Sequence, residues 1–181
     1  MTAVKKTRSY TSAVRREQAE QTRTRIVEAA AVLFDEQGYG PTTIKQIADR
    51  ANVAVDTIYA IFGNKARVLT AWMDARLSGP HAVSNVTEVP EAVAIRDAKD
   101  HNKQIAAFVR FIDVISERVW PVNDIMRSAA AVDQQMAAIY QEMHGYRFRN
   151  MTVIASWLTA RGKLRVDEDR AAETLWTLAS P

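Results

Sequence analysis

Two short apolar segments separated by a tight break constrain the fold of this chain more than any other feature. In residues 44–51 the apolar side chains recur at the three- and four-residue spacing of one helix face. Residues 55–62 repeat this spacing after a gap of only three residues. Asn52, the first residue of the gap, tolerates the left-handed conformation that ends many helices. Two short helices joined by so tight a turn form a helix-turn-helix.

Longer helical patterns flank this motif on both sides. Residues 19–37 place small and aliphatic side chains on one face, and Gly38 ends the pattern. After the motif, Asn64 is suited to cap a longer helix that continues to Leu77. We therefore expect one domain over residues 19–77, which includes the connecting helix from residue 64.

The remaining residues, 78–181, also have helical spacing throughout. A short helix is possible after Pro90, a strong one covers residues 105–115, and Pro121 is expected to start another. Asp133 is a good cap for the longest pattern, and Asp167 for the last. No stretch alternates with the period of a β-strand, so the chain is predicted to be all-α.

The positive charge of the chain is concentrated near its N-terminus. Residues 1–25 contain seven Lys or Arg side chains but only two acidic ones, Glu17 and Glu20. Residues 1–18 show no hydrophobic period, which predicts a flexible basic arm. A basic arm of this kind can bind polyanions such as nucleic acid, although a tail that only increases solubility has the same composition.

Several functional classes are disfavoured by what the sequence lacks. Hydrophobic residues make up 48% of the chain, but no run reaches the length of a membrane span, and there is no cysteine. His81, His101 and His144 are scattered without the spacing of metal ligands. We therefore expect a cytoplasmic protein that is not an enzyme, uses no metal or cofactor, and does not contact membranes.

The segment from Pro41 to Lys65, PTTIKQIADRANVAVDTIYAIFGNK, resembles the DNA-binding segment of tetracycline-repressor (TetR) family regulators. The preceding helix, ending at Gly38, is similar to the first helix of that family. The resemblance implies an N-terminal three-helix DNA-binding domain followed by a helical domain that binds a ligand and forms a homodimer. It further implies a repressor that a small molecule releases from a palindromic double-stranded operator. The matching positions include Ile47, Ala48, Val53, Thr57, Tyr59, Phe62, Lys65 and Leu69.

Residues for DNA contact follow from how a helix-turn-helix docks. Its second helix enters the major groove, and the first residues of that helix reach the base edges. Flanking polar side chains hold phosphates and set the register. Five apolar positions are better explained as core residues, namely Ile47, Ala48, Ile58, Phe62 and Leu69. The predicted DNA-contacting residues are Thr43, Lys45, Val55, Asp56, Thr57, Tyr59 and Lys65.

The segment departs from the family's usual pattern at several of these positions. Asn52 stands in place of the usual turn glycine, which the chain can tolerate. Ala54 replaces the usual Ser or Thr, so the recognition helix lacks a capping hydrogen bond worth about 1 kcal/mol. Asp56 brings a negative charge toward DNA, which lowers the affinity unless the carboxylate accepts a hydrogen bond from a cytosine amino group. Ile61 stands where the family often has a His or Tyr that contacts the DNA backbone. These changes predict an altered operator and fewer phosphate contacts, with a degenerate motif as the alternative.

For the second part of the chain the resemblance implies roles, and the residues are only candidates. Arg127 lies among apolar residues, where it would need an acidic partner or anionic ligand, but a surface position is the simpler interpretation. The final helix stops at Pro181, so the interface is either short or the helix incomplete. The ligand candidates are Trp72, His101, Phe108, Ile112, Met126 and Arg127, and the dimer candidates are Met151, Ile154, Trp157 and Trp176.

A sequence-tolerant architectural DNA-binding protein is the alternative function. The large second part, residues 78–181, counts against it, because this part is nearly neutral, with twelve basic and thirteen acidic side chains. Such a part suits regulation better than coating of DNA. A specific regulator should keep a large affinity ratio between operator and random DNA at physiological salt.

Overall fold

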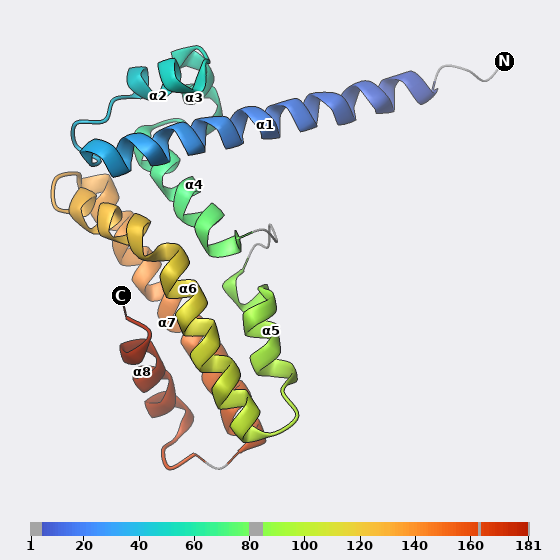
Figure 1. Cartoon of the computed structure of the whole chain (residues 1–181), viewed down its shortest axis with the longest axis vertical. Helices are drawn as coiled ribbons and strands as arrows, with labels where there is room; N and C mark the ends of the chain where they lie inside the picture. Colours follow the sequence, from blue (N-terminus) through green and yellow to red (C-terminus); the bar gives the residue numbers. More distant parts are fainter. Residues whose placement is uncertain (1–4, 80–84, 163, 181) are drawn as a thin grey trace. The chain divides into compact units, whose positions relative to one another are not determined.

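The computed structural model describes residues 5–79, 85–162 and 164–180 of the chain. In these residues the chain forms eight α-helices and a 3-10 helix, without any strand (Figure 1). The prediction of an all-α fold is confirmed. None of the described helices combines the length and the apolar composition that a bilayer crossing needs. The chain divides into two compact units, residues 1–72 and 73–181, which are described separately below.

The first unit contains α1 (Lys5–Gln37), α2 (Ile44–Ala51), α3 (Val55–Phe62) and the start of α4 (Lys65–Ser78). Its core joins residues from all four helices, because each contributes an apolar face that it cannot bury alone. The five motif residues expected to form the core, Ile47, Ala48, Ile58, Phe62 and Leu69, are all buried. The fully buried side chains include Ile26, Phe34, Ile47, Ile58 and Leu69, each with 0% exposure.

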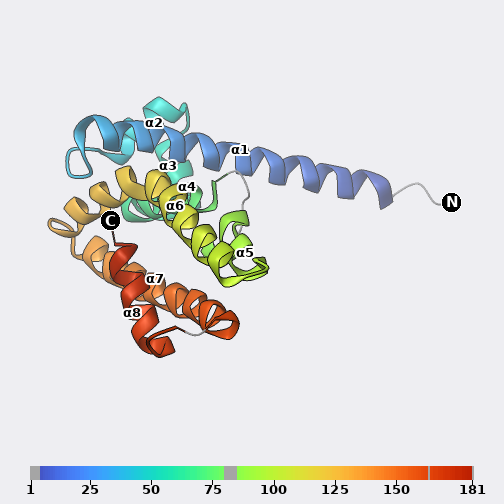
Figure 2. The same cartoon turned by 60° about the horizontal axis from the view of Figure 1, so that its bottom comes forward.

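Residues 1–18, expected to be a flexible arm, are helical from Lys5 onward as part of α1, while residues 1–4 lie outside the described part. Residues 5–37 contain no glycine or proline, and many are good helix formers. Once the second half of α1 packs on its domain, the costly nucleation step is over and the helix can extend. Figures 1 and 2 both show α1 continuing far past α2 and α3.

The second unit consists of the end of α4, the 3-10 helix η2 (Val86–Glu88) and four α-helices. These are α5 (Pro90–Asp97), α6 (His101–Ala130), α7 (Gln134–Arg161) and α8 (Glu168–Leu178). Phe111, Ile154 and Leu158 lie at the centre of an apolar core to which η2, α5, α6, α7 and α8 contribute. Asp133 and Asp167 cap α7 and α8 by accepting from backbone N–H groups, as the sequence predicts.

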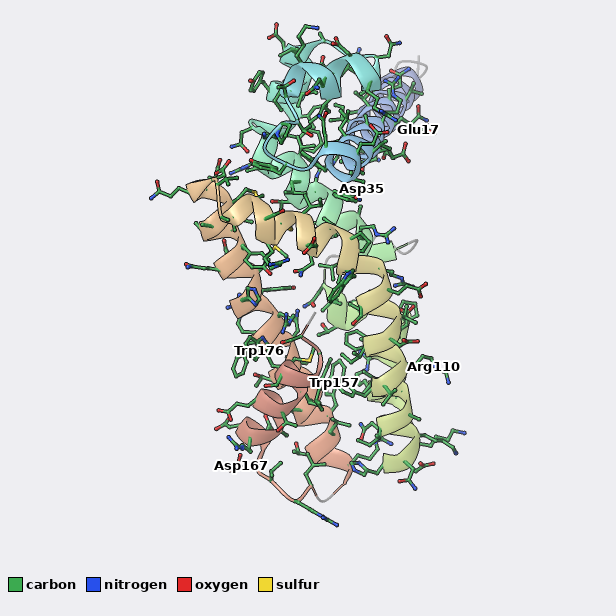
Figure 3. The ribbon with its side chains drawn as sticks, turned by 60° about the vertical axis from the view of Figure 1, so that its left-hand side comes forward. Glu17, Asp35, Arg110, Trp157, Asp167 and Trp176 are labelled. Atoms are coloured by element: carbon green, nitrogen blue, oxygen red, sulfur yellow. The ribbon has the colours of Figure 1, made fainter. Side chains whose placement is uncertain are left out.

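The prediction that Pro121 starts a separate helix is wrong. Helix α6 runs through Pro121 without interruption, and Figure 3 shows a bend along α6. A proline inside a helix removes one backbone hydrogen bond and displaces the preceding turn, which bends the helix rather than ending it when packing holds both halves. The backbone carbonyl of Arg118 in that preceding turn accepts a hydrogen bond from Arg76 Nε of α4.

Candidate nucleic-acid interface

The two short helices are defined by local hydrogen bonds that suit their sequence. The Thr43 hydroxyl accepts from Gln46 N (3.2 Å), and Thr43 N donates to Gln46 Oε1 (2.8 Å), so the two residues form a capping box. Asn52 ends α2 in the left-handed conformation, with φ 52° and ψ 54°. Only the three residues 52–54 therefore separate the end of α2 from the start of α3.

Helix α3 presents one face to the domain core and another to solvent. Ile58 and Phe62 are buried, whereas Asp56 is exposed and Tyr59 keeps 50% of its surface exposed. Val55 and Thr57 are half-buried in the same first turn. The outer face of α3 therefore offers a carboxylate, a hydroxyl and a phenol, as required of a helix that reads base edges.

The N-terminus of α3 lacks a side-chain cap, as the sequence predicts. Ala54 occupies the cap position and makes no side-chain hydrogen bond. Asp56 in the first turn places a negative charge near the positive end of the helix dipole. Gly63 ends α3 with φ 79°, a value that other residues rarely adopt.

Lys65 occupies a different environment from the one that its predicted phosphate contact requires. Its ammonium group donates to the carbonyl oxygens of Tyr39 and Thr42, both at 2.8 Å, and lies 4.1 Å from the centroid of the Tyr39 ring. A third carbonyl, that of Gly40, lies 3.4 Å away. Lys65 thus ties the start of α4 to the loop between α1 and α2, and a phosphate would have to compete with these bonds.

The other predicted phosphate contacts lie on the surface of α2. Lys45 is exposed and pairs with Asp49, with Nζ 2.7 Å from Oδ2. Exposed pairs of this kind are weak, so a phosphate can replace the carboxylate at little cost. The Thr43 hydroxyl is exposed but already serves in the capping box.

Arg23 and Arg50 are functional candidates that the sequence does not single out. The Arg23 guanidinium carbon lies 4.7 Å from the centroid of the Phe62 ring, so this arginine packs against the last residue of α3. Arg50 Nη1 lies 3.3 Å from Glu36 Oε2 and links α2 to α1. Contacts between residues so distant in the sequence leave no local signal that could predict them.

Two of the six predicted ligand residues lie too far apart on one helix to share a single small site. Trp72 is buried in the first unit, where its ring stacks on Phe34 at a centroid distance of 6.3 Å. His101 and Met126 lie 25 residues apart on α6, or about 37 Å along a straight helix. Phe108 belongs to the apolar core, with Ile112 packed against it. This set needs correction, because no small ligand could touch residues so widely spaced.

Arg127 has an acidic neighbour and is exposed to solvent. Its guanidinium binds Asp124 one turn earlier in α6, with Nη2 2.5 Å from Oδ1, and both side chains are more than half exposed. The hydrogen bond to Asp124 raises the pKa of Arg127 further. The simpler interpretation of Arg127 as a surface residue therefore describes its position.

The four predicted dimer residues differ in accessibility. Met151 and Ile154 are 3% and 0% exposed within the single chain, so the prediction that they form an interface conflicts with their burial. Their spacing on α7 is that of a buried stripe, which the sequence alone cannot distinguish from an interface stripe. Trp157 and Trp176, labelled in Figure 3, are only partly buried against the same core.

Trp176 belongs to an aromatic and cationic cluster where α8 packs on α7. The Arg147 guanidinium carbon lies 5.1 Å from the centroid of the Trp176 ring, and Nη2 donates to the Trp176 carbonyl (3.1 Å). The His144 ring packs edge-on against Tyr140, with centroids 4.6 Å apart. Burial, and then the charge of Arg147, lower the pKa of His144. Burial also lowers the pKa of Arg147.

Comparison with known proteins shows that the first unit matches a known protein family. Residues 26–71 match the family model described as bacterial regulatory proteins, tetR family. The match begins at Ile26, a fully buried residue of α1, and ends in α4, so it covers the core of the first unit.

Relatives that match most of the chain carry names of the same kind. The HTH-type transcriptional regulator TtgR of Pseudomonas putida is 26% identical over 166 residues, which are 89% of this chain and 78% of TtgR. Two solved structures share the fold. SmeT in its triclosan complex has a TM-score of 0.64 at 24% identity, covering 88% of this chain and 77% of SmeT. NalD, the secondary repressor of the MexAB-OprM multidrug efflux pump in Pseudomonas aeruginosa, has a TM-score of 0.60 at 20% identity, covering 88% of this chain and 81% of NalD.

Proposed function

Because this chain belongs to the TetR family of bacterial regulatory proteins and is a DNA-binding transcription regulator rather than an enzyme, we propose that it is a cytoplasmic repressor of genes controlled by a palindromic operator. The single observation that carries this proposal is the outer face of α3, which is exposed over a fully buried inner face. NalD, which has the same fold, is itself described as a repressor.

In the proposed complex, α3 lies in the major groove and reads base edges with its first turn. Asp56 would accept from the exocyclic amine of cytosine, and Thr57 could contact either kind of base. Tyr59, half exposed, has a hydroxyl suited to a phosphate. Lys45 and Thr43 would hold phosphates from α2. Lys65 would act mainly by shaping the loop that precedes α2.

The palindrome requires two copies of the chain, and we place their interface on α7 and α8. The support is a set of large apolar side chains that the single chain leaves exposed on these helices. A two-fold interface between such helices would bury them and hold two recognition helices about one turn of DNA apart. The side chains are Tyr146, Phe148 and Val153 on α7 and Leu178 on α8, with exposures of 39%, 39%, 41% and 70%.

A small molecule would release the repressor by binding to the second unit. The triclosan complex of SmeT supports this part of the proposal, because a protein of the same fold accommodates a small molecule. An effector acts only if it binds more tightly to a conformation with lower operator affinity. A screen for compounds that release the selected operator would identify the effector.

The experiment that tests the proposed function is selection of bound duplexes from a random library at physiological salt. A specific repressor should enrich a palindrome that it binds at least about a thousand-fold more tightly than scrambled DNA. An architectural protein should enrich nothing. Sedimentation of the protein with the selected duplex should give two chains for each palindrome.

Two substitutions then separate base reading from overall binding. Asp56→Arg should change the enriched sequence, because a bidentate contact to guanine replaces an acceptor for cytosine. Lys45→Gln should weaken all duplexes alike and reduce the salt dependence by about one phosphate contact for each chain. Equal loss of all binding by both variants, with normal folding, would contradict the roles assigned to α2 and α3.

A further inference from the structure

We propose that the projecting part of α1, residues 5–25, is a second DNA-binding element that lies along the duplex outside the site read by α3. This inference rests on the proposed DNA-binding function and extends it. The ordinary helix-turn-helix ends its contacts close to its own half-site. A long basic helix attached to it would lengthen the footprint on both sides of a palindrome.

The first observation is that this part of α1 projects from the domain with an excess of positive charge. Residues 15–21 are all exposed, and the buried core positions of α1 begin at Ile26 among the side chains that the structure describes. Figures 1 and 2 show the helix continuing beyond the other helices of its unit. Residues 5–25 carry seven basic side chains against two acidic ones. Arg15, Arg16 and Arg25 are exposed and therefore available to an external polyanion.

The second observation is that two of the arginines share a helix face with the domain core. Arg16, Arg23 and Ala30 are spaced by seven residues, so they follow one another along nearly the same face of α1. Ala30 is fully buried in the core, and Arg23 packs on Phe62 at the end of α3. The basic face of the projecting helix is therefore continuous with the side that carries the helix-turn-helix.

The third observation concerns the kind of partner that this face fits. Residues 5–22 contain four apolar or aromatic side chains. Tyr10, Ala13 and Val14 have the spacing of one face but cover a single turn, and Ala19 falls on the opposite side, so no apolar stripe runs along this part of the helix. A helix that docks on another protein needs such a stripe. A helix whose one-sided feature is charge fits a phosphate backbone instead.

The length of the helix suits a duplex. Residues 5–25 are all helical and span about 31 Å, which corresponds to about nine base pairs, or nearly one turn of B-DNA. The element is thus long enough to contact phosphates over about one turn beyond each half-site. These contacts would carry no base specificity and would be strongly salt-dependent. These contacts would compensate for the capping hydrogen bond that Ala54 lacks and for the DNA-backbone contact that Ile61 does not make.

The test uses the full-length protein and two forms of the duplex obtained by selection. One form keeps about one turn of fixed flanking sequence on each side, and the other is trimmed to the enriched positions. The variant Arg15→Gln/Arg16→Gln removes two exposed charges from α1. The matched control, Arg110→Gln/Arg165→Gln, removes two exposed arginines from the second unit. A third variant, Arg15→Lys/Arg16→Lys, keeps the charge.

We expect trimming to weaken the unaltered protein and the control about tenfold or more, but to change the glutamine variant much less. The salt slope of the glutamine variant on the long duplex should fall by about 0.9 for each phosphate that the substitutions release. The lysine variant should keep both the flank effect and the slope. Circular dichroism checks that the variants retain their helix content.

The proposal is overturned if trimming affects the glutamine variant and the unaltered protein equally, or if the control loses as much salt dependence. Strong binding of the protein to anionic lipid vesicles that the glutamine variant loses, without a flank effect on DNA, would also overturn it. If selection enriches no sequence, the proposed repressor function fails, yet the same comparison on long and short random duplexes still decides the role of α1.

Discussion

The two units of this chain differ in how their function relates to neighbouring residues in the sequence. In the first unit, the capped start of α2, the left-handed Asn52 and the exposed turn of α3 all lie within one continuous stretch, residues 43–57. In the second unit, the core joins residues from Val89 to Leu175. The exposed surface of α3 is formed by residues close together in the sequence, whereas any binding site in the second unit would have to be formed by packing of distant residues.

We therefore expect that a substitution can destabilise one unit and leave the other folded. Ile58 in α3 and Ile154 in α7 are both fully buried, so each truncation to alanine should cost about 2–5 kcal/mol. We expect Ile58→Ala to raise hydrogen exchange in α2 and α3 and to abolish operator binding while α7 and α8 stay protected. We expect the reverse pattern of exchange for Ile154→Ala.

Hydrogen–deuterium exchange followed by mass spectrometry resolves these regions. Loss of protection throughout the chain in both variants would show that the units unfold as one, and the distinction between them would no longer apply to stability. The measurement should be made below saturation with DNA, because a bound operator stabilises the folded state by mass action.

The next largest effect concerns Lys65, whose ammonium holds three carbonyls of the loop between α1 and α2. Replacing Lys65 with methionine keeps the aliphatic stem but leaves those carbonyls without their charged donor. Hydrogen bonds to charged groups contribute about 1.5–3 kcal/mol, so the free energy of unfolding should fall by an amount within this range. Urea unfolding measures it.

The same variant distinguishes a structural role from a phosphate contact. If Lys65 has a structural role, its replacement by methionine should cause a large loss of stability, and the salt slope of the remaining DNA binding should not change. A phosphate ligand predicts normal stability and a slope reduced by about one contact for each chain. Lys45→Gln, on the exposed face of α2, serves as the control for the second behaviour.

A smaller, stabilising effect is expected at the start of α3. Ala54→Ser adds a side chain that can accept from an N–H group of the first turn, and caps of this kind are worth about 1 kcal/mol. The midpoint of urea unfolding should rise without a change in the denaturant slope. An unchanged or lower midpoint would mean that Asp56 already satisfies this helix end.

What the sequence predicts well, and what it does not, depends on whether a feature is set by neighbouring residues or by packing between distant ones. Asn52, Asp133 and Asp167 are recognisable as helix ends because capping depends on neighbours within four residues. The continuity of α6 through Pro121 cannot be deduced, because packing on other helices decides whether a proline bends or ends a helix.

Side-chain partners across the fold are equally inaccessible from the sequence. Lys65 has the position of a phosphate ligand, but its carbonyl partners lie more than twenty residues earlier. Ile154 has the spacing of an interface residue as well as that of a core residue, and only its burial separates the two. The ligand candidates fail for the same reason, since composition does not show which residues meet.

The smallest expected effect lies in the second unit, where packing rather than a local motif sets the chemistry of His144. Burial and Arg147 lower the pKa of His144, so the unfolded chain binds the proton more readily than the folded chain. Stability should therefore be full above the unfolded pKa of about 6.5 and should decline as the pH falls through it toward the lowered value. His144→Gln should remove the part of the decline that begins as the pH falls through about 6.5. Urea unfolding at several pH values measures it, with a histidine NMR titration as the direct check. A decline of the same size in the variant would place the titrating group elsewhere, and the cluster of Arg147, Trp176 and His144 would then be ordinary packing rather than a pH-sensitive contact between α7 and α8.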